Sequence, residues 1–151
     1  MQFSGALIDE PCVVAPDDTS IKLDFHTIVE TYLYFNERTS SQFFTIHLQN
    51  CSIKDWPGEG TVIVHFEGSE NTALPGYLAT ANEESGIAIG IENEGGVFLG
   101  LGKDSAPIKL DNGDVALTFG AFIKAEPEAV QNKTIALGDF SATATFFLDF
   151  P

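Results

Sequence analysis

The chain ends with GDFSATATFFLDFP (residues 138–151), a stretch in which apolar and polar residues alternate. Every second residue from 140 to 150 is apolar: Phe140, Ala142, Ala144, Phe146, Leu148 and Phe150. Alternation with a period of two is typical of a β-strand with one buried face. Edge strands commonly carry charges or proline that discourage pairing, whereas this apolar row continues to the last but one residue. The stretch therefore predicts a strand and raises the question of what it pairs with.

The rest of the chain repeats this pattern in short runs that are separated by turn sequences. Alternating runs occupy residues 2–8, 19–25, 42–51, 60–68, 86–93 and 115–119. Clusters of Gly, Pro, Asn and Asp lie between them, and DNGD (residues 111–114) is interpreted as a hairpin turn rather than a calcium loop. One or two turns of helix are predicted within residues 126–133 and nowhere else. Many short strands at this spacing predict one all-β domain over residues 1–151, an antiparallel sandwich or barrel.

Composition and charge exclude several classes of function. The chain has 151 residues, enough for one domain with a hydrophobic core. It carries 22 acidic against 7 basic residues, for a net charge of −15. This charge repels phosphate backbones and anionic lipids, so we expect binding neither to nucleic acid nor to a membrane surface. No apolar run reaches the roughly 20 residues that a membrane-spanning helix needs.

The two cysteines, Cys12 and Cys51, leave two readings open. They are two buried free thiols of a cytosolic protein, or they form a disulfide. A disulfide would close a loop of about 40 residues and stabilise the fold by about 4 kcal/mol in the chain-entropy description. A bond of that kind persists in the periplasm or outside the cell. A closed zinc site is excluded, because no histidine lies at a ligand spacing from either cysteine.

Residues suited to catalysis form no recognisable constellation. The histidines are His26, His47 and His65, and the last two are out of phase with the apolar residues of their runs, so we expect them to face solvent. They could form a metal site or an acid–base pair only if their strands were neighbours. No GxSxG, HExxH, P-loop or EF-hand spacing occurs. The sequence therefore indicates no enzyme, no metal site and no cofactor.

Four segments together resemble the subunits of chaperone–usher pili. They are FSGALIDEPCVV (3–14), FTIHLQNC (44–51), FGAFIKAEPEA (119–129) and the closing GDFSATATFFLDFP. Gly138 matches the family's glycine fourteen residues from the carboxyl end, and Phe150 matches its penultimate aromatic residue, although that residue is more commonly Tyr and here Pro151 follows it. FEGSENTALPGYL (66–78) and IGIENEGG (89–96) are most similar to the small tip-fibrillum and adaptor subunits of P pili.

This resemblance implies a fold and an explanation for the terminal strand. Such subunits are immunoglobulin-like sandwiches, the pilin fold, that lack their seventh strand, so the final strand borders an open apolar groove. A strand of a periplasmic chaperone fills the groove first, and the amino-terminal extension of the next subunit replaces it at the outer-membrane usher. The resemblance also implies a Cys12–Cys51 disulfide. The predicted groove residues are Phe3, Leu7, Ala144, Phe146, Leu148 and Phe150. Phe147, out of phase, is expected to face outward and to contact the chaperone or a neighbouring subunit.

The function that follows is a non-catalytic minor or adaptor pilin, in the periplasm during transit and then in a pilus outside the cell. Only Met1 and Gln2 precede Phe3, so the donor extension is expected to be absent from this chain. A carbohydrate-binding adhesin module is an alternative, for which Trp56 with Tyr77 would be the nucleus. A subunit that terminates the pilus is another.

Overall fold

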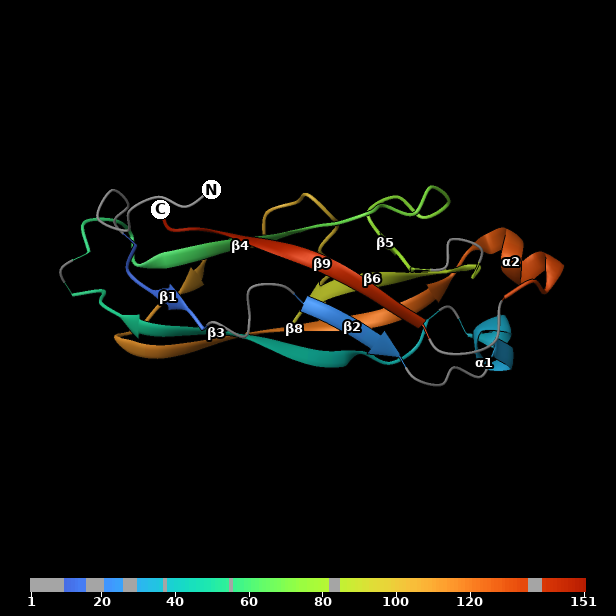
Figure 1. Cartoon of the computed structure of the whole chain (residues 1–151), viewed down its shortest axis with the longest axis horizontal. Coiled ribbons are helices and arrows are strands. Elements are labelled where there is room, and N and C mark those ends of the chain that lie inside the picture. Colours follow the sequence, from blue (N-terminus) through green and yellow to red (C-terminus); the bar gives the residue numbers. More distant parts are fainter. Residues whose placement is uncertain are drawn as a thin grey trace.

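The strands of the protein form two antiparallel sheets packed face to face, and the prediction of an all-β sandwich is confirmed (Figure 1). The structure, a computed structural model, describes residues 10–15, 21–25, 30–36, 38–54, 56–81, 85–135 and 140–151. One sheet, here called the β8 sheet, has the order β1 (Val13–Val14), β3 (Gln42–Cys51), β8 (Gly113–Ala125), β6 (Ile87–Asn93), β5 (Leu78–Ala79). The other, the β9 sheet, has the order β2 (Ile21–Phe25), β9 (Phe140–Asp149), β4 (Thr61–Glu67), β7 (Ile108–Lys109).

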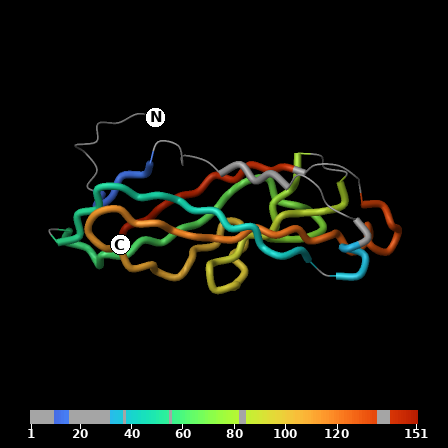
Figure 2. Tube along the Cα trace, turned by 90° about the horizontal axis from the view of Figure 1, so that it is seen from below, coloured from blue at the N-terminus to red at the C-terminus, as the bar shows by residue number. Residues whose placement is uncertain are grey.

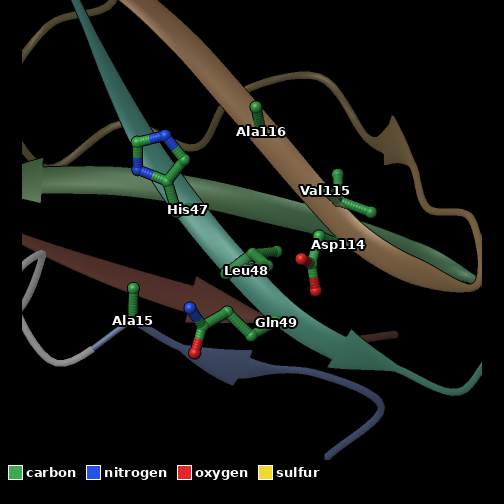
Figure 3. A pocket seen from close by; sticks show the side chains of 7 residues that line it. All are labelled: Ala15, His47, Leu48, Gln49, Asp114, Val115 and Ala116. Atoms are coloured by element: carbon green, nitrogen blue, oxygen red, sulfur yellow. The ribbon is translucent and has the colours of Figure 1, made fainter.

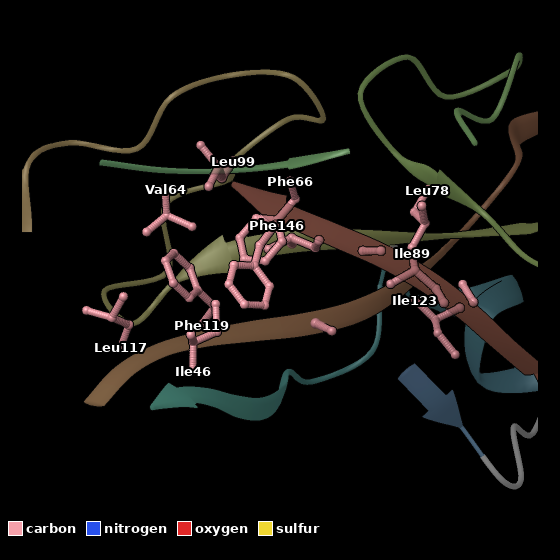
Figure 4. Packing of buried hydrophobic residues seen from close by; sticks show 14 of the residues in the cluster. Ile46, Val64, Phe66, Leu78, Ile89, Leu99, Leu117, Phe119, Ile123 and Phe146 are labelled. Atoms are coloured by element: carbon pink, nitrogen blue, oxygen red, sulfur yellow. The ribbon is translucent and has the colours of Figure 1, made fainter. Parts of the chain in front are cut away.

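The core between the sheets is made of the residues that the alternation assigns to one face of each strand. The fully buried members include Ile46, Leu48, Val62, Val64, Phe66, Leu117 and Phe119. The rings of Phe66 and Phe119 meet edge to face at 5.1 Å (Figure 4). Phe44 packs on both rings. Each strand thus buries one face against the opposite sheet, as in other aligned sandwiches.

Two short helices lie at one end of the sandwich, and the carboxyl end of the chain lies at the other (Figures 1 and 2). Helix α2 (Pro127–Asn132) falls in the predicted segment, with Pro127 in its first turn and Lys133 in the left-handed conformation at its end. Helix α1 (Glu30–Phe35) was not predicted. Six residues are too few to show helical periodicity, and Leu33, which is buried, ties this turn to the core. No helix in the described ranges is long and apolar enough to cross a membrane.

The interpretation of DNGD as a hairpin turn is wrong. The strands on either side of it, β7 and β8, belong to different sheets, so this turn carries the chain across the sandwich. The Oδ1 atom of Asn112 accepts hydrogen bonds from the backbone N–H groups of Ile53 (2.7 Å) and Lys54 (3.3 Å). Gly113 has φ +97°, which suits glycine. The Asn-Gly pair predicts a tight turn correctly, but it does not determine which sheet the next strand joins.

Cys12 and Cys51 form a disulfide, so the reading as two free thiols is wrong. Both cysteines are buried, and beside them the N–H of Ser52 donates to the carbonyl of Pro11 at 2.7 Å. The bond joins the residue before β1 to the last residue of β3. It therefore fixes the short strand β1 to the edge of the β8 sheet.

Candidate functional site

Strand β9 has different neighbours along its two halves. On one side, residues 145–149 pair with β4, and further back Ser141 accepts a backbone hydrogen bond from Ala81 at 2.9 Å. On the other side, β2 pairs with residues 140–144 and ends there. Within the described part of the chain, no strand pairs with residues 145–150 on the β2 side. We call the β2 side of residues 145–150, which are the second half of β9 and the residue after it, the open edge.

The side chains of β9 alternate as the sequence predicts. Ala142, Ala144 and Phe146 are buried in the core, whereas Leu148 and Phe150 are only half-buried. Relative exposure is 1% at Ala144 and 9% at Phe146, so the cover over the inward face thins toward the carboxyl end. The sequence therefore gives the correct face, and the thinning cover coincides with the half of β9 that β2 does not reach.

The opposite sheet ends with β1, at the same end of the sandwich as the open edge (Figure 1). Its register places Val13 opposite Gln49 and Val14 opposite Leu48 of β3. Val14 packs on the core, while Val13 is 57% exposed. Phe3 and Leu7, two of the predicted groove residues, lie outside the described residues, as does Gly138.

Phe147 points outward, as predicted, and is 47% exposed. Its ring stacks on His65 of β4, with centroids 4.9 Å apart and planes 12° apart. The Nε2 atom of His65 lies 3.0 Å from Glu67 Oε2, and its Nδ1 atom lies 3.6 Å from Asp104 Oδ1. An aromatic ring, an imidazole and two carboxylates thus form a small exposed surface beside the open edge.

The structure does not bring His47 and His65 together, because β3 and β4 belong to different sheets. His47 instead lines a pocket of about 430 Å³ on the β8 sheet (Figure 3). Its other lining residues are Ala15, Leu48, Gln49, Asp114, Val115 and Ala116. His26 lies outside the described residues, and the described residues contain no group of three or more His, Cys, Asp or Glu that could hold a metal ion. The pocket draws on three separate segments, so no local sequence signal could have found it.

Trp56 and Tyr77, the proposed nucleus of a carbohydrate site, lie in different surroundings. Tyr77 stacks on Phe98 with centroids 4.7 Å apart and meets Phe122 edge to face. The Trp56 indole lies against the Gly58 turn, where Pro151 accepts a hydrogen bond from the N–H of Glu59 at 2.8 Å. The two aromatic residues therefore do not form one binding platform.

A partly buried ion pair on the outer face of the β8 sheet was not expected from the sequence. Arg38 Nη1 donates to Glu92 Oε1 at 2.7 Å, and the Ser41 hydroxyl donates to Glu92 Oε2. The Arg38 guanidinium lies 3.6 Å above the Phe122 ring. The hydrogen bond from Arg38 is the main reason that the pKa of Glu92 is lowered, against the opposing effect of burial. The partners lie 54 residues apart, and the ion pair stabilises the fold rather than forming a reactive site.

Comparison with known proteins agrees with the resemblance to pilus subunits. The fimbrial protein family matches residues 1–151. The fimbrial adapter PapK of Escherichia coli is 32% identical over 156 residues, covering 98% of the chain and 85% of PapK. The minor fimbrial subunit PmfF of Proteus mirabilis is 29% identical over 154 residues, covering 99% of the chain and 83% of PmfF.

Two solved structures have the same fold. The P pilus rod subunit PapA superposes with a TM-score of 0.77 at 21% identity, covering 94% of the chain and 100% of PapA. A chain from the structure of a chaperone–usher pilus superposes with a TM-score of 0.79 at 24% identity, covering 100% of this chain and 94% of that one. At these identities the likeness concerns the fold alone, and the prediction of an immunoglobulin-like pilin sandwich is confirmed.

Proposed function

The chain belongs to the fimbrial protein family and is a pilus subunit, and we propose that it is a minor or adaptor subunit that is assembled by accepting an extended strand on β9. The observation that carries this proposal is the open edge. Strand β2 pairs with β9 along residues 140–144, whereas residues 145–149 pair with β4 on the other side and have no described partner on the β2 side. A strand edge of this kind is a ready template for another chain.

The chemistry of the open edge favours an extended apolar peptide as its occupant. Main-chain groups on the free side of β9 supply hydrogen bonds in strand addition, and alternate side chains supply specificity. Phe146, Leu148 and Phe150 point inward, and the last two are only half-buried. Large apolar side chains of an added strand would complete their burial, at about 25 cal/mol for each Å² removed from water.

The proposed partners follow from this chemistry. In the periplasm a strand of the pilus chaperone occupies the open edge, and at the outer-membrane usher the extension of a neighbouring subunit replaces it. The Cys12–Cys51 disulfide suits this route, because disulfides persist in the periplasm and at the cell surface. We propose a purely structural role without catalysis, and a final location in the extracellular pilus.

The direct test is a thermal melt of the monomeric protein, freed of chaperone, with and without a peptide of alternating large apolar residues. We expect the peptide to raise Tm progressively as its free concentration increases above Kd, and a scrambled peptide to leave Tm unchanged, because a ligand that binds only the folded state stabilises it by mass action. A high, cooperative melt that the peptide does not move would contradict the proposal.

Two variants of adjacent residues sharpen the test. Phe146→Asp places a carboxylate on the inward face, where an unpaired charge is strongly unfavourable, and should abolish capture by the chaperone. Phe147→Asp places the same charge on the exposed face of the same strand, outside the predicted groove, so it should reduce capture much less than Phe146→Asp. Co-purification with the chaperone measures both, and equal capture of the two variants would count against strand addition at β9.

A further inference from the structure

We infer that β2 is an internal competitor for the docking edge of β9, so that a long docked strand has to displace β2 while a short one does not. This inference rests on the proposed function and deepens it. It starts from the register, because β2 covers residues 140–144 of β9 and stops where the open edge begins. The docking edge is therefore one continuous edge, of which the protein itself already occupies half.

The backbone directions of β9 show that both halves use the same edge. In a strand, the N–H and C=O of one residue point to the same side, and successive residues point to opposite sides. Ser141 accepts from Ala81, and Pro151 accepts from Glu59 just before β4, so the odd-numbered residues point toward β4. The even-numbered residues must then point to the β2 side. On that side, residues 140, 142 and 144 face β2, whereas residues 146, 148 and 150 lie beyond its end.

In the part of the chain that the structure describes, strand β2 pairs with the sheet along one side only. It has five residues, lies at the end of its sheet, and β9 is its only paired strand among the described residues. The first half of β9 keeps neighbours on its other side, where Ala81 donates to Ser141 and Gly68 lies close to the Thr143 carbonyl. Removing β2 therefore leaves β9 attached to the sheet, and a docked strand restores each backbone pair that β2 gives up.

This arrangement separates peptides by length. A peptide of about six residues fits along residues 145–150 beside β2, at about 3.3 Å per residue. A peptide of about eleven residues needs the edge along residues 140–144 as well, and can use it only when β2 leaves. The dependence of affinity on peptide length therefore shows whether β2 leaves β9 when a peptide binds.

A disulfide across β2 and β9 tests the inference. Lys22 lies directly opposite Thr143, and because odd residues of β9 point away from β2, the two form a non-hydrogen-bonded pair with a short Cα separation. Such pairs suit a disulfide. The variant is Lys22→Cys with Thr143→Cys, compared with its own reduced form. A matched control places the same kind of disulfide lock between β4 and β7, at the other edge of the sheet. It uses Thr61→Cys and Lys109→Cys, which are opposite each other.

In the reduced variant, we expect the long peptide to bind at least about tenfold more tightly than the short one, and its binding to speed amide exchange in residues 21–25. Oxidation of the Lys22–Thr143 lock should remove that advantage and leave binding of the short peptide unchanged, and the control lock should change neither. Equal affinity of the two peptides in every form, with residues 21–25 still protected, would overturn the inference while leaving the proposed function intact. If neither peptide binds, the proposed function fails and the inference fails with it.

Discussion

Strands β6 and β9 are both central in their sheets, yet only β6 is covered on both faces. Every residue from Ile87 to Glu92 is buried. The core covers the inward face of the strand, and aromatic side chains cover its outward face. A Cβ atom on Gly90 would lie 2.4 Å from Phe122 Cζ, which shows how closely that cover approaches the strand. Strand β9 exposes its outward residues and has an open edge along half its length. Strand β6 is thus enclosed by the protein itself, whereas β9 has no paired strand on the β2 side of residues 145–149 within the described residues.

The largest expected effect concerns the disulfide that fixes the edge of the β8 sheet. Replacing both Cys12 and Cys51 by Ala should lower the free energy of unfolding by about 4 kcal/mol, because the bond closes a long loop in the unfolded chain. Urea unfolding of the variant and of the oxidised parent measures the difference. Finding two free thiols by mass spectrometry in native protein would remove the basis of this prediction.

A matched pair of leucines compares the covered and open regions directly. Leu48 of β3 is fully buried, so Leu48→Ala should cost about 3 kcal/mol. Leu148 is half-buried, and Leu148→Ala should cost about 1 kcal/mol in the isolated protein. With a docked peptide the cost at Leu148 should rise, because the added strand completes its burial. Denaturant unfolding with and without peptide distinguishes these cases. If Leu148→Ala lowers the free energy of unfolding by the same amount with and without peptide, the comparison is contradicted.

The ion pair on the covered face predicts a pH dependence. Arg38 lowers the pKa of Glu92 in the folded protein, so this carboxylate adds stability above its unfolded pKa of about 4.3. That contribution is lost as the pH falls through the lower folded pKa. Glu92→Gln should cost about 2 kcal/mol at pH 7, because it leaves Arg38 without its charged partner, and should flatten the loss of stability in acid. Glu94→Gln, at an exposed position in the next turn, is the control.

The smallest expected effect is on the exposed face of β9. Phe147→Ser removes the ring that stacks on His65 and should change the free energy of unfolding by no more than about 0.5 kcal/mol. If Phe147 contacts the chaperone or a neighbouring subunit, the same variant weakens that complex while its own melt stays unchanged. A loss of stability as large as that of Leu48→Ala would mean that Phe147 belongs to the core.

The candidate site was predictable in part from the sequence. Alternation over residues 140–150 predicted which side chains of β9 point inward, because successive residues of a strand face opposite sides whatever the strand pairs with. The residues that pair with β9 could not be predicted in this way. The halves of β9 carry the same alternation, yet β2 covers one half only, and that depends on where the chain crosses from the β8 sheet at Ala15 to the β9 sheet at Ile21.

The sequence by itself determined the longer strand segments within the described residues, their inward faces, the helix after β8 and the family resemblance, because these depend on local periodicity and on residues in a fixed order. It did not predict the two-residue strands β5 and β7. Only the tertiary structure decided that DNGD joins two sheets, that His47 and His65 lie apart, and that Glu92 is buried against Arg38. Each of these depends on contacts between residues far apart in the chain. Local propensity carries no information about such contacts, since the alternation of a strand is the same whichever sheet the strand joins.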